Sequence, residues 1–341
     1  FYDWIAWNNN VITIDKSFIF TGKIIMQTVK KWTLCAVLGA SLLAVGCTSI
    51  GKKIDQAFAI KADYYTQVQS NYPIERQYNG LGQHQVQSQV FPSNDTRFKT
   101  YKIWYPADIA QTQKPYPVIV SANGTGIAYQ KYEPVLARLA SWGFVVIAND
   151  DKSSWDGVSS SLSLAKLDEL NADKNSIFYQ KLNTNHAGIA GHSQGGVGAI
   201  NGATQFANSR QFKSVYTASM PKLALAQALK WNYHVNKIAV PYFATAGMGK
   251  VDAGDGKDKK SGIAPLWSMQ ENAGQINNQK LTVMARRTQT DHGDMLHRGD
   301  GYMTAWFRYT LLNDVNAGKA FVGANPEIQQ NGLWQDVQIK P

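Results

Sequence analysis

Short apolar runs and longer amphipathic segments alternate along most of the chain. Residues 116–122 (YPVIVSA) and 144–148 (FVVIA) are continuous apolar runs, which are typical of strands buried on both faces of a sheet. Residues 132–142 place apolar side chains three or four positions apart and are followed by Gly143, which predicts a helix that ends there. The same patterns predict further strands at residues 85–91, 101–105, 186–190, 212–218, 238–246 and 281–286, and further helices at residues 163–182, 195–206, 223–231, 266–273 and 302–312.

This order of elements predicts the fold class. Strands that alternate with helices of about ten residues or more are typical of βαβ units, and therefore of a mostly parallel central sheet flanked by helices. Two strands precede the first helix, so we expect the sheet to begin antiparallel. Residues 76–341 contain no internal repeat and no linker, which favours one α/β domain without a large lid domain. Pro241 is unusual inside the predicted strand 238–246, because it has no N–H to donate.

The first 46 residues have the pattern of a segment that is removed. Met26 is the first methionine, Lys30 and Lys31 follow it, and residues 32–46 are uncharged. This uncharged stretch suits the apolar region of a signal peptide and is too short to span a bilayer. We therefore expect residues 26–46 to be a signal peptide. Residues 1–25 are expected to be an untranslated or upstream segment, or alternatively part of a longer product.

A cysteine follows the uncharged stretch directly. The segment Ala44-Val45-Gly46-Cys47 resembles the lipobox of bacterial lipoproteins. The resemblance implies that Cys47 is the lipidated N-terminus of the mature chain and that residues 47–75 form a spacer. The expected location is then the bacterial cell envelope, lipid-anchored on the periplasmic or outer-membrane face, with secretion also open. An ordinary secretory signal and a membrane-spanning anchor are the alternatives.

Composition and charge limit the classes of molecule that the protein is expected to bind. Hydrophobic residues make up 44% of the chain and charged residues 17%, which suits a folded protein and excludes a disordered one. The net charge of +10 becomes +8 without residues 1–46, which hold four lysines and two aspartates. There is no basic stripe with interleaved aromatic residues, so we expect no nucleic-acid partner. We expect the N-terminal lipid to hold the protein at the membrane, where anionic headgroups are the expected partner for its positive charge. Cys35 would leave with the signal peptide, so no disulfide is expected within the mature chain.

One motif predicts nucleophilic chemistry. Gly191-His192-Ser193-Gln194-Gly195 fits G-x-S-x-G, with an apolar strand before it and a glycine- and alanine-rich helix after it. This strand–turn–helix setting is that of a nucleophile elbow, in which a strained turn presents the serine hydroxyl above the sheet. The alternative is an ordinary serine in a glycine-rich turn.

A serine hydroxyl needs an adjacent base to become a strong nucleophile. His292 follows the predicted strand 281–286 and precedes the last predicted helix, so it is the candidate general base and general acid. His297 is the alternative. His186 and His234 flank or precede the wrong strands, and so does His192. His292 in an ordinary surface turn is the remaining possibility.

The acid that orients the imidazole should follow the predicted strand 238–246. Asp252 lies nearest the end of that strand, and Asp255 and Asp258 are the alternatives. Three aspartates in a loop rich in glycine and lysine also suit a solvated turn. Their spacing does not match the alternate-position ligands of an EF-hand, so no metal is expected.

An oxyanion hole needs two backbone N–H donors. Gln194, directly after the serine, is expected to supply one, and Thr125, in the loop after strand 116–122, the other. Neither a Walker A motif nor a G-x-G-x-x-G motif is present in the sequence, so no cofactor is expected.

Over residues 85–315 the sequence resembles the α/β-hydrolase superfamily. The resemblance lies in the segments VIVSANGTG, LARLASWGFVVIAND, GHSQGG, DHGDML and GYMTAWFRYTLLND. Within the superfamily the chain is similar to dienelactone-hydrolase-like and chlorophyllase-like esterases and to bacterial cutinases and polyester hydrolases. This resemblance implies the α/β-hydrolase fold and a serine carboxylesterase that uses Ser193, His292 and Asp252. The implied substrates are small to medium acyl esters and, further, polyesters.

The sequence departs from the polyester-hydrolase pattern in several places. Residues 218–222 contain no aromatic wall residue, the second oxyanion position is Thr125 instead of an aromatic residue, and no C-terminal disulfide can form. The loop after the predicted strand 238–246, which holds the candidate acid, is also longer than in that group. An amidase or peptidase with the same triad, and a non-catalytic envelope lipoprotein that uses the fold for binding, are the alternative functions.

Overall fold

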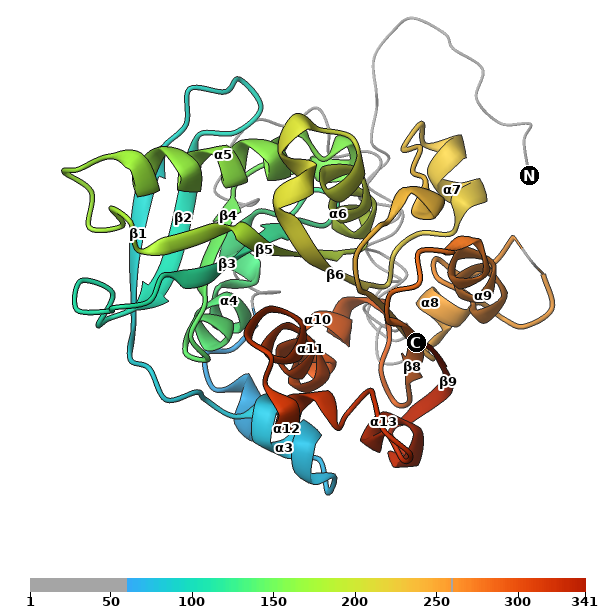
Figure 1. The fold of residues 1–341 in the computed structure, drawn as a ribbon. Helices are drawn as coiled ribbons and strands as arrows, with labels where there is room; N and C mark the ends of the chain where they lie inside the picture. Colours follow the sequence, from blue (N-terminus) through green and yellow to red (C-terminus); the bar gives the residue numbers. More distant parts are fainter. Residues whose placement is uncertain (1–59, 259) are drawn as a thin grey trace, which may run out of the picture. The chain divides into compact units, whose positions relative to one another are not determined.

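The computed structural model describes residues 60–258 and 260–341, and within them one mixed sheet forms the centre (Figure 1). Its strand order is β1-β2-β4-β3-β5-β6-β7-β8-β9. Neighbouring strands from β4 through β8 pair in parallel, whereas β1–β2, β2–β4 and β8–β9 pair antiparallel. The strands are β1 (Val86–Pro92), β2 (Thr100–Pro106), β3 (Tyr116–Ala122), β4 (Val145–Asn149), β5 (Leu182–His192), β6 (Phe212–Ala218), β7 (Tyr242–Gly247), β8 (Thr282–Arg287) and β9 (Trp334–Lys340).

Helices cover both faces of this sheet. In Figure 1, α5 and α6 lie over one face, and α4, α10 and α11 lie over the other. None of the helices within residues 60–258 and 260–341 has the length and apolarity needed to cross a membrane. The helices are α3 (Pro73–Asn79), α4 (Glu133–Ala140), α5 (Val158–Ala172), α6 (Gln194–Thr204), α7 (Leu223–Ala228), α8 (Lys250–Ala253), α9 (Leu266–Gln275), α10 (Met295–Arg298), α11 (Asp300–Leu312), α12 (Val315–Gly318) and α13 (Glu327–Gln330).

The continuous apolar runs arise because the central strands are buried on both faces. In β3, Val118 and Val120 pack into the core beneath α5 and α6, and Ile119 between them packs into the core beneath α4 and α11. Successive side chains of a strand point to opposite faces, so a strand with helices on both sides needs apolar residues at every position. The expected α/β fold class, a mostly parallel sheet flanked by helices with an antiparallel start, is confirmed.

Several expected boundaries differ from the observed ones. The helix expected at residues 163–182 spans Val158–Ala172, and Leu182 instead begins β5, where it pairs with Tyr116. The strand expected at residues 238–246 begins only at Tyr242, directly after Pro241. Strand β9 (Trp334–Lys340) was not expected, because it is a largely exposed edge strand rich in polar residues. Periodicity is weak where a strand is neither buried on both faces nor cleanly alternating.

The folded region begins before residue 76, where the spacer was expected to end. Tyr64 and Ile74 are buried in the core, and the backbone N–H of Ile60 donates to the carbonyl of Lys131. Tyr64 packs there because its hydroxyl contacts the carboxylate of Asp300 at the start of α11. Helix α3 lies beside α11 and α12, far away in sequence (Figure 1). The segments expected to be upstream sequence (1–25) and signal peptide (26–46) lie outside the described residues, and so does Cys47.

Candidate active site

Ser193 occupies a strained turn between β5 and α6. Its backbone has φ 57° and ψ −124°, a left-handed conformation that costs a residue with a side chain about 1–3 kcal/mol. Its N–H donates to the carbonyl of Ala218 at 2.9 Å, which holds the turn against β6. A Cβ atom on Gly191 would lie 1.9 Å from the carbonyl oxygen of Gly195, and one on Gly195 would lie 2.1 Å from that of Ala122. The two glycines of the motif therefore allow the turn to close.

Three side chains form one hydrogen-bonded line at the carboxyl ends of the parallel strands. The Oγ atom of Ser193 lies 2.9 Å from Nε2 of His292, and Nδ1 of His292 lies 2.7 Å from Oδ1 of Asp252. Ser193 follows β5, Asp252 lies in α8 after β7, and His292 opens the 3-10 helix η8 (His292–Asp294) after β8. The structure thus brings together the three residues that the sequence indicated.

Asp252 is fully buried, and both of its carboxylate oxygens have partners. Oδ1 faces His292, and Oδ2 accepts hydrogen bonds from the hydroxyl of Ser219 at 2.5 Å and from the N–H of Gly247 at 2.7 Å. Burying a carboxylate is costly unless hydrogen bonds replace its water, and these donors do so. The carboxylate can therefore hold the His292 ring with Nδ1 protonated and Nε2 free to accept a proton.

The alternative acids lie apart from the histidine. Asp255 is exposed, and its carboxylate accepts from the N–H groups of Lys257 and Asp258 and from the hydroxyl of Ser261. These hydrogen bonds, led by that from Lys257, lower the pKa of Asp255 to about 2. Asp258 accepts from the N–H of Lys260 in the same loop. The carboxylates of both aspartates therefore form hydrogen bonds within their own loop.

His297, the alternative base, also lies apart from the serine. It sits in α10, and its Nε2 lies 4.0 Å from Oδ1 of Asp294. Burial, and then the nearby cation of Arg298, lower the pKa of His297 to about 4. The His297 ring therefore stays neutral. It packs edge-on against the ring of Tyr64, with the two ring centres 5.9 Å apart.

The expected oxyanion donors lie on one helix and one loop. Gln194 is the first residue of α6, and Thr125 lies in the loop after β3. Within residues 60–258 and 260–341, the backbone N–H groups of both residues donate to no protein acceptor. The Thr125 loop is held by Asn123, whose side-chain amide donates to the carbonyls of Asn149 at 2.7 Å and Asp151 at 2.8 Å. Both N–H groups are thus available to a ligand atom.

A comparison with protein families bears on this arrangement. Residues 76–233 match the family described as PET hydrolase-like. The chain has the α/β-hydrolase fold. The match spans β1 to α7, including Ser193 and both expected oxyanion positions, and it confirms the similarity to cutinases and polyester hydrolases. It also supports hydrolase activity. A search of curated proteins found no match to the chain.

Two residues that the sequence did not indicate support the hydrogen-bonded line of Ser193, His292 and Asp252. The carboxylate of Asp291 accepts the N–H groups of His292 at 2.8 Å, Asp252 at 3.0 Å and Val251 at 3.2 Å. It therefore ties the two loops together. Ser219, at φ 53°, donates to Asp252 as described above. Neither has a motif of its own, because Asp291 binds backbone N–H groups and Ser219 binds a carboxylate that only folding brings close.

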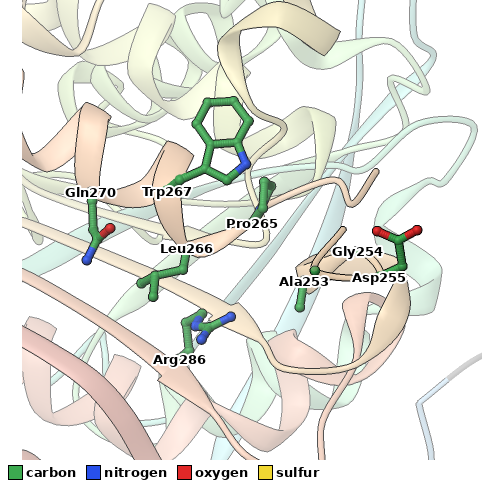
Figure 2. A pocket seen from close by; sticks show the side chains of 9 residues that line it. Ala253, Gly254, Asp255, Pro265, Leu266, Trp267, Gln270 and Arg286 are labelled. Carbon is green, nitrogen blue, oxygen red and sulfur yellow. The ribbon is translucent and has the colours of Figure 1, made fainter. Parts of the chain in front are cut away.

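A surface hollow of the hydrolase adjoins the acid loop (Figure 2). Its volume is about 490 Å³, and its walls include Trp267 and Gln270 of α9 and Arg286 of β8. Arg286 is paired there with Asp336 at 2.7 Å. Neither Ser193 nor His292 lines the hollow, so it is separate from the reaction site. Within the described part of the chain no group of three or more His, Cys, Asp or Glu side chains is placed to bind a metal.

Proposed function

We propose that this protein is a serine carboxylic ester hydrolase that works through an acyl-enzyme intermediate. The observation that carries the proposal is the hydrogen-bonded line from Ser193 through His292 to Asp252. Such a line activates a hydroxyl for attack on an acyl carbon. The family match to PET hydrolase-like proteins supports the same chemistry.

The first half of the reaction acylates the serine. Ser193 Oγ attacks the carbonyl carbon of the ester, and its proton passes to Nε2 of His292. The carbonyl oxygen becomes an oxyanion that accepts hydrogen bonds from the N–H groups of Thr125 and Gln194. Asp252 stabilises the resulting imidazolium through Nδ1–H. The imidazolium then gives its proton to the departing alkoxide oxygen, the C–O bond breaks, and an alcohol leaves.

The second half releases the acid. His292 Nε2 accepts a proton from a water molecule as the water oxygen attacks the acyl carbon. The same two N–H groups bind the second oxyanion. The imidazolium returns the proton to Ser193 Oγ, the acyl–serine bond breaks, and a carboxylic acid leaves. One water is consumed per ester, and the enzyme is regenerated.

Replacing the nucleophile tests this proposal. Ser193→Ala removes the attacking oxygen, and we expect hydrolysis of p-nitrophenyl acetate and butyrate to fall by about a millionfold, as for other serine hydrolases. Labelling by a fluorophosphonate probe should disappear as well. Ser153→Ala, a change at an exposed serine outside the line, is the control and should keep full activity. A wild-type protein that neither labels nor turns over would indicate a non-catalytic binding protein, and a preference for p-nitroanilides over esters would indicate an amidase.

We propose small to medium acyl esters as the preferred substrates, with polyesters second. Lys222 is buried at the end of the segment where polyester hydrolases are expected to have an aromatic wall. Its ammonium donates to the carbonyls of Lys260, Ser261 and Gly262 at 2.6–2.8 Å. A side chain engaged in this way clamps the acid loop and offers no flat surface for an aromatic polymer unit. Rates on p-nitrophenyl acetate, butyrate and octanoate beside release from a polyester film would test this order.

We also propose a lipid anchor at Cys47 and a location in the bacterial cell envelope. Support comes from the sequence alone: the uncharged stretch 32–46 and the small residues before Cys47. Mass spectrometry of the membrane fraction should find a mature chain that begins at a diacylated Cys47. Any other mature N-terminus would contradict the anchor without affecting the proposed reaction.

A further inference from the structure

His192, which precedes the nucleophile, has no role in the reaction described above. It is buried, and its ring lies 5.0 Å from the ring of His292, centre to centre. Its Nε2 lies 2.7 Å from the backbone carbonyl oxygen of His292. The N–H of His292 is held by Asp291, so both backbone polar groups of the general base are bound by side chains.

The carbonyl contact determines which nitrogen of His192 carries the proton. A carbonyl oxygen only accepts, so Nε2 of His192 must donate and Nδ1 must be the unprotonated acceptor. The hydroxyl of Tyr132 lies 3.3 Å from Nδ1 and can donate to it. Burial, and then the nearby His292, Lys131 and His297, hold the pKa of His192 well below its ordinary value. A neutral ring is the form that this pair of partners requires.

Tyr132 connects the ring of His192 to the loop after β3. It is buried and precedes α4. Gly124, next to the expected oxyanion donor Thr125, packs directly against the Tyr132 hydroxyl. A Cβ atom on Gly124 would come within 3.0 Å of that hydroxyl, so the loop passes very close to the tyrosine.

We infer that Tyr132 and His192 are positioning residues that hold the general base His292 in register with the oxyanion loop. Gly124 of the loop after β3 packs against the Tyr132 hydroxyl, this hydroxyl bonds to Nδ1 of His192, and Nε2 of His192 bonds to the carbonyl of His292. These contacts pass beside Ser193 and link the loop that carries His292 to the loop that carries Thr125. This inference rests on the proposed esterase function.

Two substitutions of His192 separate hydrogen bonding from packing. His192→Gln places an amide donor near the position of Nε2, whereas His192→Leu fills space without a donor. We expect His192→Leu to lower kcat on p-nitrophenyl butyrate by about a hundredfold, the cost of misplacing a catalytic group by about 1 Å, with KM nearly unchanged. His192→Gln should restore most of that loss. Wild-type kcat in the Leu variant, or equal loss in both variants, would overturn the inference.

A matched pair of tyrosines tests the other end of the chain. Tyr132→Phe should lower kcat, by less than His192→Leu does, because the His192 ring stays in place. Tyr129→Phe removes another buried hydroxyl three residues away, on a ring that packs edge-on against Trp104 at 5.7 Å, and should leave kcat unchanged. Equal effects of the two changes would contradict a specific role for Tyr132.

Nuclear magnetic resonance gives a readout that does not depend on activity. In the full chain, 15N spectra should show His192 with the proton on Nε2, and Tyr132→Phe should shift the Nδ1 signal. A proton on Nδ1 would overturn the inference even in an active enzyme. A wild-type protein with the expected tautomer but no fluorophosphonate labelling would instead contradict the proposed function and leave the hydrogen-bond chain standing.

Discussion

At the scale of single residues, burial and partners distinguish chemically identical side chains. Asp252, Asp255 and Asp258 share one loop region, yet only Asp252 is fully buried with both oxygens engaged. The acid of a triad must hold one imidazole tautomer, which requires a fixed carboxylate and not merely a nearby one. Asp255 instead accepts hydrogen bonds from its own loop, and these lower its pKa.

This difference predicts the outcome of two conservative substitutions. Asp252→Asn should lower kcat on p-nitrophenyl butyrate by about a thousandfold or more, because an amide favours the wrong tautomer of His292. Asp255→Asn is the matched control and should leave kcat within about twofold, since an exposed change away from the reacting groups has little effect. Steady-state kinetics of both variants checks this. The assignment of the acid would be wrong if Asp255→Asn proved to be the more damaging change.

At the scale of elements, the segment after β8 holds the proposed general base His292 and, directly after it, a helix that contributes to the pH dependence of stability. Helix α10 (Met295–Arg298) follows His292 directly and contains His297, which has a pKa of about 4 in the folded protein. An unfolded histidine titrates near 6.5. Between these two values the unfolded chain binds the proton and the folded chain does not. Stability therefore falls as the pH drops from about 6.5 towards 4.

Replacing His297 should weaken the pH dependence of the free energy of unfolding between about pH 6.5 and pH 4. The wild-type free energy of unfolding should fall by about 2–3 kcal/mol more than that of His297→Gln between pH 7 and pH 4, given 1.36 kcal/mol per pKa unit. His84→Gln, a change at a partly exposed histidine on another loop, should keep the wild-type slope. Urea unfolding at a series of pH values measures this. Parallel curves for wild type and His297→Gln would contradict the burial of a neutral ring.

At the scale of the whole described region, a buried ion pair connects segments far apart in the sequence. Nε of Arg138 in α4 lies 2.7 Å from Oδ2 of Asp300 at the start of α11, and both side chains are almost fully buried. Tyr64, near the start of the described chain, contacts both of them. The pair and Tyr64 thus join three segments that are far apart in the sequence.

Breaking this pair should destabilise the fold strongly. Arg138→Met leaves Asp300 buried without its cation, and we expect a loss of about 3–5 kcal/mol in the free energy of unfolding. Lys102→Met breaks a more exposed ion pair, in which Lys102 of β2 lies 2.7 Å from Glu133 of α4. This change should lower the free energy of unfolding by less than about 1 kcal/mol. The double variant Arg138→Met/Asp300→Leu should recover part of the loss, because neither charge then remains. Urea unfolding of the three variants provides the comparison, and equal losses at Arg138 and Lys102 would contradict it.

The sequence by itself determined the features that local patterns encode. Apolar runs such as residues 116–122 predicted the central strands, and Gly191 and Gly195 around Ser193 predicted the strained turn, because both depend on neighbouring residues. The tertiary structure alone decided which aspartate meets His292, that Tyr64 belongs to the core, and that β9 completes the sheet. These depend on contacts between residues far apart in the sequence, and hydrogen bonds to backbone groups, such as those of His192 and Asp291, leave no pattern in the residues they contact.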